Sequence, residues 1–92
     1  MRLLLTESFQ RDLKSLTPAD RARALEIVLV LPVALGDVHR HAGIGLRKLH
    51  PSGIWEARSG LDLRLLFGYA GGEVVLRRAA THDEVRRYLR GL

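Results

Sequence analysis

Apolar and polar residues alternate through residues 54–67, a pattern that predicts two strands joined by a tight turn. Gly60 lies inside this stretch and tolerates the positive φ angle that tight turns require. We expect a three-residue loop from Ser59 to Leu61, because a two-residue loop would mix charged side chains into the apolar face. The residues sharing the apolar face are then Trp55, Ala57, Leu63, Leu65 and Phe67.

The other face of this predicted hairpin carries charged residues. In the expected register, the residues opposite each other are Arg58 and Asp62, Glu56 and Arg64, and Ile54 and Leu66. Two cross-strand ion pairs on a solvated face explain such a pattern, each contributing ~0.2–1 kcal/mol. Two guanidinium groups on one face would also bind a phosphate group, because they match its oxygens bidentately.

The N-terminal third of the chain predicts a strand and two helices. Residues 1–5 are mostly apolar, and Thr6 can cap the helix that follows. The apolar positions of that helix recur at i, i+4 and i+7, at Phe9, Leu13 and Leu16. A second helix is predicted from Thr17 and Pro18, a cap followed by a proline at the first helical position, to Pro32. We expect its buried side to consist of Ala22, Leu25, Val28 and Leu29.

The remainder predicts four strands and one last helix. Residues 35–45 are polar and glycine-bearing and predict an irregular loop, which contains His39, Arg40 and His41. Strands are expected at 45–50, at two places within 54–67, and at 73–80, with turns at 51–53 and 69–72. Thr81 and Glu84 have the spacing of a capping box. The apolar side of the helix after it is expected to consist of Val85, Tyr88, Leu89 and Leu92.

This order predicts a single α+β domain over residues 1–92, with an N-terminal strand and two-helix hairpin packed on an antiparallel sheet and a C-terminal helix. The chain of 92 residues is 47% hydrophobic and 27% charged, as in soluble globular proteins. No apolar run approaches the ~20 residues of a membrane span, so no membrane association is expected. Cysteine is absent, which fits a cytoplasmic protein. The net charge of +5 favours a polyanionic or acidic partner.

His82 and a group of basic residues are the candidates for chemistry. His82 falls at the first position of the capped helix, at the margin of the sheet, and an imidazole accepts and donates protons near neutral pH. The alternative is an ordinary exposed histidine at a helix start. Near Arg58 and Arg64, neighbouring strands add the basic side chains Arg47, Lys48, His50, Arg77 and Arg78.

Other chemistries have less support. The four histidines have poor spacing for zinc and no cysteine beside them, so no metal or other cofactor is expected. No glycine loop of the phosphate-binding type precedes a helix, and no serine lies near a histidine–carboxylate motif. Trp55 shares its face with Leu63 and Leu65, which favours a place in the core over a role in stacking bases.

Four motifs resemble the RelE/ParE superfamily of toxins from type II toxin–antitoxin systems, with the RelE/YafQ-like branch favoured. They are Lys48-Leu49, Trp55-Glu56-Ala57-Arg58, Asp62 to Phe67, and Thr81 to Val85. RelE-like members are ribosome-associated endoribonucleases that cut messenger RNA, whereas ParE-like members inhibit DNA gyrase. The resemblance therefore implies a cytoplasmic toxin that inhibits translation, with an acidic antitoxin and mRNA on the ribosome as partners in a hetero-oligomer. The alternative is a ParE-like gyrase inhibitor without nuclease activity.

The resemblance also suggests a role for individual residues. Arg64 matches an arginine that RelE-like enzymes place at the scissile phosphate, Arg58 a basic residue on the preceding strand, and His82 a catalytic histidine of the YafQ and YoeB branches. The residues implied in RNA binding are Lys48, Arg47, His50, Arg78 and Asp62. A helix follows His82 where those relatives carry a terminal aromatic residue, which keeps the ParE-like alternative open.

The mechanism expected from these roles is cleavage by the substrate's own 2′-hydroxyl, without a metal ion. His82 would act as general acid or base, with Arg64 and Arg58 stabilising the charge of the transition state. A second proton-transfer group is needed, for which Glu56 and Lys48 are the candidates.

Overall fold

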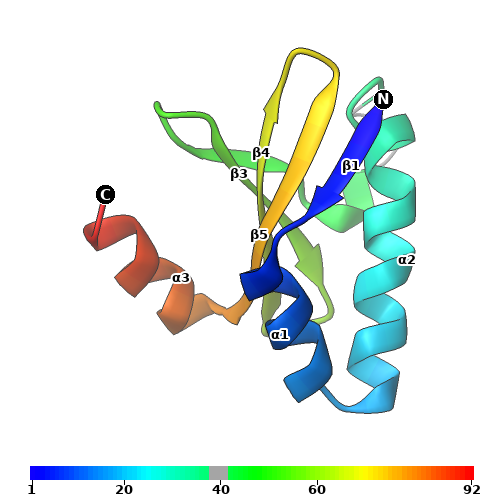
Figure 1. The fold of residues 1–92 in the computed structure, drawn as a ribbon, viewed down its shortest axis with the longest axis vertical. Helices are drawn as coiled ribbons and strands as arrows, with labels where there is room; N and C mark the ends of the chain where they lie inside the picture. Colours follow the sequence, from blue (N-terminus) through cyan, green and yellow to red (C-terminus); the bar gives the residue numbers. More distant parts are fainter. Residues whose placement is uncertain (38–41) are drawn as a thin grey trace.

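The computed structural model describes residues 1–37 and 42–92, and within these ranges five strands form one sheet with helices beside it (Figure 1). The strands are β1 (Arg2–Leu5), β2 (Arg47–His50), β3 (Ile54–Ser59), β4 (Leu63–Ala70) and β5 (Glu73–Thr81). The helices are α1 (Glu7–Ser15), α2 (Pro18–Ala34), the short 3₁₀ turn η1 (Ala42–Ile44) and α3 (His82–Arg90). This confirms the predicted α+β fold class. His39, Arg40 and His41 of the expected loop lie outside the described residues.

The sheet has the strand order β1-β5-β4-β3-β2. The four later strands pair antiparallel, as expected, but β1 lies parallel to β5 at one edge, so the sheet is mixed. Two helices and three strands separate β1 from β5 along the chain, and no tight turn fixes their relative direction. None of the described helices is long and apolar enough to cross a membrane.

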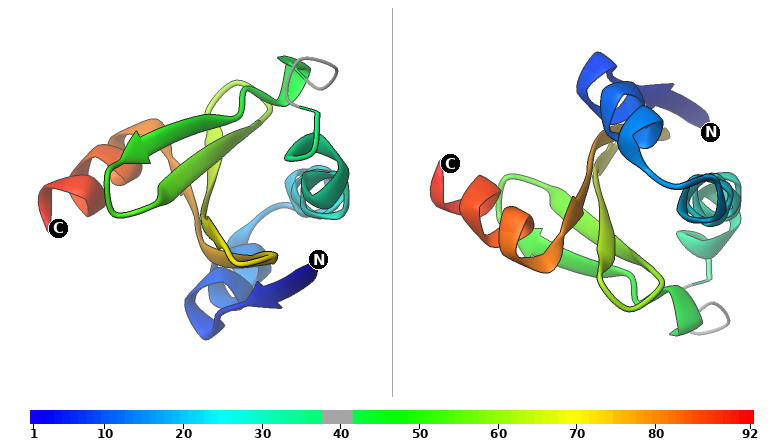
Figure 2. Two further views of the ribbon diagram at one scale, coloured as in Figure 1. Left: turned by 90° about the horizontal axis from the view of Figure 1, so that it is seen from above. Right: turned by 90° about the horizontal axis from the view of Figure 1, so that it is seen from below.

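The helices cover opposite sides of the sheet: α1 and α2 lie on one side and α3 on the other (Figure 2). The main core lies between the sheet and the first two helices, where Phe9 and Leu13 of α1 meet Leu65 and Phe67 of β4. Trp55 packs on this core with its ring stacked on Phe67 at 6.5 Å between centroids. The predicted apolar face of the hairpin is therefore confirmed.

The buried side of α2 differs from the prediction. The side chains that face the core are Ala24, Val28, Leu31 and Ala34. Of the four predicted residues only Val28 is buried, whereas Leu25 is 38% and Leu29 72% exposed and Ala22 is exposed as well. Apolar residues occur on every side of this helix, so its periodicity did not single out one face.

The predicted helix starts are confirmed. The hydroxyl oxygens of Thr6, Thr17 and Thr81 each accept a hydrogen bond from the backbone N–H of the third residue of α1, α2 and α3, respectively. The end of α2 differs, because the helix continues through Pro32 to Ala34. The N–H of Leu35 still donates to the carbonyl of Leu31, so the proline interrupts the hydrogen bonding without ending the helix.

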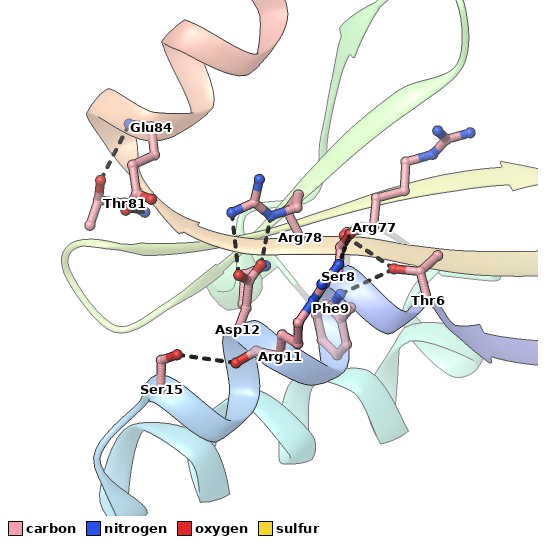
Figure 3. A network of polar contacts seen from close by, with 11 residues as sticks. Thr6, Ser8, Phe9, Arg11, Asp12, Ser15, Arg77, Arg78, Thr81 and Glu84 are labelled. Atoms are coloured by element: carbon pink, nitrogen blue, oxygen red, sulfur yellow. Dashed lines mark hydrogen bonds and ion pairs between the residues drawn. The ribbon is translucent and has the colours of Figure 1, made fainter.

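Side chains of α1 satisfy the free edge of β5 beyond the end of β1 (Figure 3). The Thr6 hydroxyl donates to the Arg77 carbonyl, and the Asp12 carboxylate accepts from the Ala79 N–H at 2.9 Å. The same carboxylate accepts from Arg78 Nε at 2.7 Å and Nη2 at 3.3 Å. Asp12 thus takes the place of a neighbouring strand and anchors α1 to the sheet.

Candidate active site on the sheet face

The register of the β3–β4 hairpin differs by two residues from the predicted one. Arg58 lies opposite Arg64, not Asp62, while Glu56 lies opposite Leu66 and Ile54 opposite Gly68. Ser59 belongs to β3, so the turn consists of residues 60–62, in which Gly60 has φ +80°. A shift of two residues keeps every side chain on its face, and parity therefore could not distinguish the two registers.

The residues predicted to be catalytic lie around one pocket on the face turned away from α1 and α2. This pocket has a volume of about 280 Å³, and its lining residues are Gly45, Arg47, Glu56, Arg58, Arg64 and His82. They come from the segment before β2, from strands β2, β3 and β4, and from the first position of α3. Residues up to 37 positions apart in the chain, from Gly45 to His82, thus meet in one hollow.

Glu56 and Arg64 form the buried floor of this pocket. Glu56 is only 6% exposed, and its Oε1 lies 3.6 Å from Arg64 Nε and 3.9 Å from Arg47 Nη2. The expected ion pair between Glu56 and Arg64 is therefore present, although the two residues are diagonal rather than opposite. Arg64 also donates from Nη1 to the carbonyls of Leu61 and Leu63. These contacts hold its guanidinium in one place.

Arg64 Nε is buried and has no hydrogen-bond partner. Its ion-pair partner Glu56 Oε1 lies at 3.6 Å, beyond hydrogen-bond distance, whereas buried donors are usually hydrogen-bonded in a folded protein. Because Arg64 Nε belongs to a guanidinium that lines the pocket, an acceptor entering the pocket would interact favourably with its positive charge.

Arg58 is exposed, and its guanidinium lies over Gly45. A Cβ atom at residue 45 would come within 2.5 Å of Arg58 Nε and 2.9 Å of Nη2. Gly45 also has φ +58°, which side chains disfavour. Among the residues that the structure describes, Arg58 has no ion pair or hydrogen bond, and the expected pair with Asp62 is absent. Its charge therefore remains available to a ligand.

His82 begins α3 directly after the cap Thr81, and its ring lines the pocket from the rim of the sheet. Its side chain is exposed and has no hydrogen bond within residues 1–37 and 42–92. An imidazole and the guanidinium groups of three arginines thus share one pocket, a combination that can exchange a proton and stabilise negative charge on a phosphate.

The structure separates the other predicted RNA-binding residues from this pocket, except Arg47. Lys48 lies opposite Trp55 and so on the other face, and it lines a different hollow together with His50. The His50 ring makes its hydrogen bonds with Ser52. Asp62 lies exposed in the turn, and Arg78 is held by Asp12. Among the described residues, no three histidine, aspartate or glutamate side chains are grouped to hold a metal ion.

Gly45 was the site residue that sequence reasoning missed. Its signal was weak, because a glycine before a strand also fits an ordinary loop, and only the structure brings Arg58 against it. Glu56 was predicted as an ion-pair partner and as a candidate for proton transfer, but its burial at the floor of the pocket is visible only in the structure.

Comparison with solved structures shows which proteins share this fold. YafQ from E. coli strain BL21(DE3) superposes with a TM-score of 0.72 at 15% identity, covering 92% of this chain and 98% of that one. The RelB–RelE antitoxin–toxin complex from Methanococcus jannaschii gives a TM-score of 0.66 at 19% identity over 92% and 96% of the chains. The toxin–antitoxin complex RelBE2 from Mycobacterium tuberculosis gives 0.56 at 27% identity over 88% and 96%.

No protein-family model and no curated protein matches the sequence. The structural likeness extends over most of this chain and of each neighbour, as the motifs on β3, β4 and α3 predicted. The chain therefore has the fold of the RelE and YafQ toxins of toxin–antitoxin systems.

Proposed function

We propose that this chain is a toxin that inhibits translation by cleaving messenger RNA in the cytoplasm. The observation that carries the proposal is the single pocket in which His82, Arg58 and Arg64 meet, with neither His82 nor Arg58 paired among the described residues. The proposal further includes an acidic antitoxin as partner, because several neighbours in structure are toxin–antitoxin complexes. The ribosome is the proposed place where the messenger RNA is presented.

In the proposed reaction the ribose 2′-oxygen attacks the adjacent phosphorus, and the bond to the 5′-oxygen of the next nucleotide breaks. One group accepts the 2′-proton and another protonates the departing 5′-oxygen, leaving a 2′,3′-cyclic phosphate and a free 5′-hydroxyl. Arg58 and Arg64 would bind the non-bridging oxygens, whose charge grows in the transition state. His82 would carry out one proton transfer.

Glu56 is the proposed group for the other proton transfer. Of the two candidates from the sequence, Glu56 lines the pocket with His82, whereas Lys48 lies on the opposite face. The same carboxylate orients Arg64, since Oε1 lies 3.6 Å from Nε. Replacing Glu56 with glutamine would therefore lower the cleavage rate in two ways, by removing the proton-transfer group and by weakening the orientation of Arg64.

The proposal is tested with alanine variants in a cleavage assay on ribosome-bound and free messenger RNA. Loss of the proton-transfer group in His82→Ala is expected to lower the cleavage rate by about 10²–10⁴-fold, and loss of Arg64 by about 10²–10³-fold. Arg77→Ala is the matched control, because it removes the same charge from an exposed arginine beside Gly68, outside this pocket. Thermal unfolding verifies that each variant is folded.

Growth of cells expressing each variant separates the proposal from its alternative. Arrest with cut messenger RNA, relieved by His82→Ala and by the co-expressed neighbouring antitoxin gene, supports the nuclease. Arrest with intact messenger RNA and inhibited DNA gyrase contradicts it and supports the ParE-like alternative. Cleavage that persists at the normal rate in both His82→Ala and Arg64→Ala contradicts the assigned roles.

A further inference from the structure

We propose that the cavity between α3 and the sheet binds a nucleobase beside the scissile phosphate and favours bases with an exocyclic amino group. This inference rests on RNA as the substrate class of the proposed function. The cavity has a volume of about 320 Å³, and its lining residues are Leu66, Arg78, Ala80, Glu84, Arg87 and Tyr88. A hollow of this size is in the range that small ligands occupy.

This base cavity adjoins the candidate active site. Two cross-strand pairs, Glu56–Leu66 and Arg64–Ala80, join the two pockets. Glu56 and Arg64 line the candidate active site, and their partners line the base cavity. Directly opposed residues in antiparallel strands lie ~4.5–5.5 Å apart. Helix α3 also contributes to both hollows, since His82 lines the first and Glu84 the second. A nucleotide whose phosphate lies at Arg64 therefore has the base cavity within reach.

The surfaces of the base cavity fit a flat aromatic ring. Leu66 and Ala80 are buried and form an apolar floor, and the Tyr88 ring forms part of the wall. The guanidinium of Arg78 is fixed by its two hydrogen bonds to Asp12, as Figure 3 shows. Single-stranded bases stack on aromatic rings and on guanidinium planes, and a fixed plane loses less entropy on binding.

Glu84 decides which bases the cavity favours. Its Oε1 accepts the Thr81 N–H at 3.1 Å, so the carboxylate is fixed in place (Figure 3). The hydrogen bonds from Thr81 hold the pKa of Glu84 below its usual range, and the group is therefore an anion at neutral pH. An ionised carboxylate only accepts hydrogen bonds. Adenine, cytosine and guanine present an amino donor, whereas uracil presents carbonyl oxygens in its place.

Binding of short RNAs to the His82→Ala protein tests the inference. Two pairs of oligonucleotides are compared, differing at one position in adenine against purine, which lacks the amino group, and in cytosine against uracil. We expect the amino-bearing member to bind about tenfold or more tightly, the effect of one hydrogen bond to a charged group. The readouts are fluorescence anisotropy and NMR shifts of the Val85 and Tyr88 amides.

Two variants with matched controls locate the effect. Glu84→Gln keeps the capping-box hydrogen bond and is expected to abolish the preference for amino-bearing bases, whereas Asp83→Asn, an equal charge change on an exposed neighbour, is expected to keep it. Arg87→Ala is expected to weaken binding of all four RNAs more than Arg86→Ala, since Arg86 lies outside the cavity.

The outcomes separate this inference from the proposed function. Base-selective binding at α3 by a wild-type protein that cuts no RNA supports the base cavity and contradicts the nuclease. Normal cleavage with equal affinity for both members of each pair, or without NMR shifts in α3, overturns the base cavity and leaves the nuclease standing.

Discussion

At the scale of single residues, the candidate active site contains buried charged groups, which are uncommon on a protein surface that binds no ligand. A glutamate that is 6% exposed lies between two arginines, and Arg64 Nε is buried without a hydrogen bond. Both features lower stability, because charged and polar groups lose hydration when they are buried. An anionic ligand in the pocket would offset that loss through charge-assisted hydrogen bonds to Arg58 and Arg64.

Gly45→Ala tests whether RNA cleavage depends on the position of the Arg58 guanidinium. The new Cβ would lie 2.5 Å from Arg58 Nε, and the positive φ adds about 1–2 kcal/mol of backbone strain. We expect RNA cleavage to fall by up to about 10²-fold, because the displaced guanidinium no longer meets the phosphate. Cleavage rate and thermal unfolding are measured together.

Gly43→Ala is the control for that variant. It lies in the 3₁₀ turn that directly precedes Gly45, and no atom comes within 4 Å of its new Cβ. Its stability is expected to stay within about 0.5 kcal/mol of the wild type and its cleavage rate to stay unchanged. Equal activity of the two variants would show that Gly45 does not position Arg58.

At the scale of elements, α3 is the helix that links the two hollows. The reciprocal capping box of Thr81 and Glu84 fixes its first turn, and Val85 packs on Leu66 and Ala80 beneath it. A single set of local interactions therefore places His82 at one hollow and Glu84 at the other. The sequence motif Thr81 to Val85 thus encodes a structural helix start and both proposed sites at once.

The stability contributed by Glu84 is expected to depend on pH. Its pKa is lower in the folded protein, through the hydrogen bonds from Thr81, so its contribution is complete above the ordinary glutamate pKa. The contribution is lost as the pH falls through the lowered pKa, because protonation removes the charge that the helix start favours. Urea unfolding from pH 6 to pH 3 measures this loss.

Glu84→Gln supplies the comparison, since glutamine keeps the capping geometry but does not titrate. The stability difference between wild type and this variant should therefore shrink as the pH falls. A difference that stays constant between pH 6 and pH 3 would show that the Glu84 charge does not stabilise α3. Thr81→Ala, which removes the cap itself, is expected to cost ~0.5–2 kcal/mol at neutral pH.

At the scale of the whole molecule, β5 connects the parts that the proposed function needs. It pairs with β1 and β4, its free edge is satisfied by α1 through Asp12, and it leads directly into α3. The Asp12 hydrogen bond also raises the pKa of Arg78 above its ordinary value. The α1 helix on one side and the base cavity on the other are therefore joined through one ion pair.

Asp12→Ala is expected to destabilise the fold by about 1.5–3 kcal/mol, because it removes hydrogen bonds between charged groups and leaves the Ala79 N–H unpaired. Chemical unfolding measures the loss. Arg2→Ala is the control, since the pair of Arg2 and Glu73 at 3.7 Å is exposed and worth at most about 1 kcal/mol. Equal losses in the two variants would contradict the role of Asp12 as an anchor.

The sequence by itself determined what depends on neighbours along the chain. The caps Thr6, Thr17 and Thr81, the turn glycine Gly60 and the two faces of the hairpin follow from local hydrogen bonding, sterics and parity. These same signals placed Arg58 and Arg64 on one face and His82 at its rim, which is most of the candidate site.

Only the tertiary structure decided what depends on distant contacts. It fixed the hairpin register, the parallel direction of β1, the buried side of α2, and the contact of Gly45 with Arg58. The physical reason is that registers two residues apart preserve parity, and a helix that is apolar on all sides has no preferred face by itself. In both cases the packing of segments far apart in the chain selects one arrangement among several that satisfy the local pattern equally well.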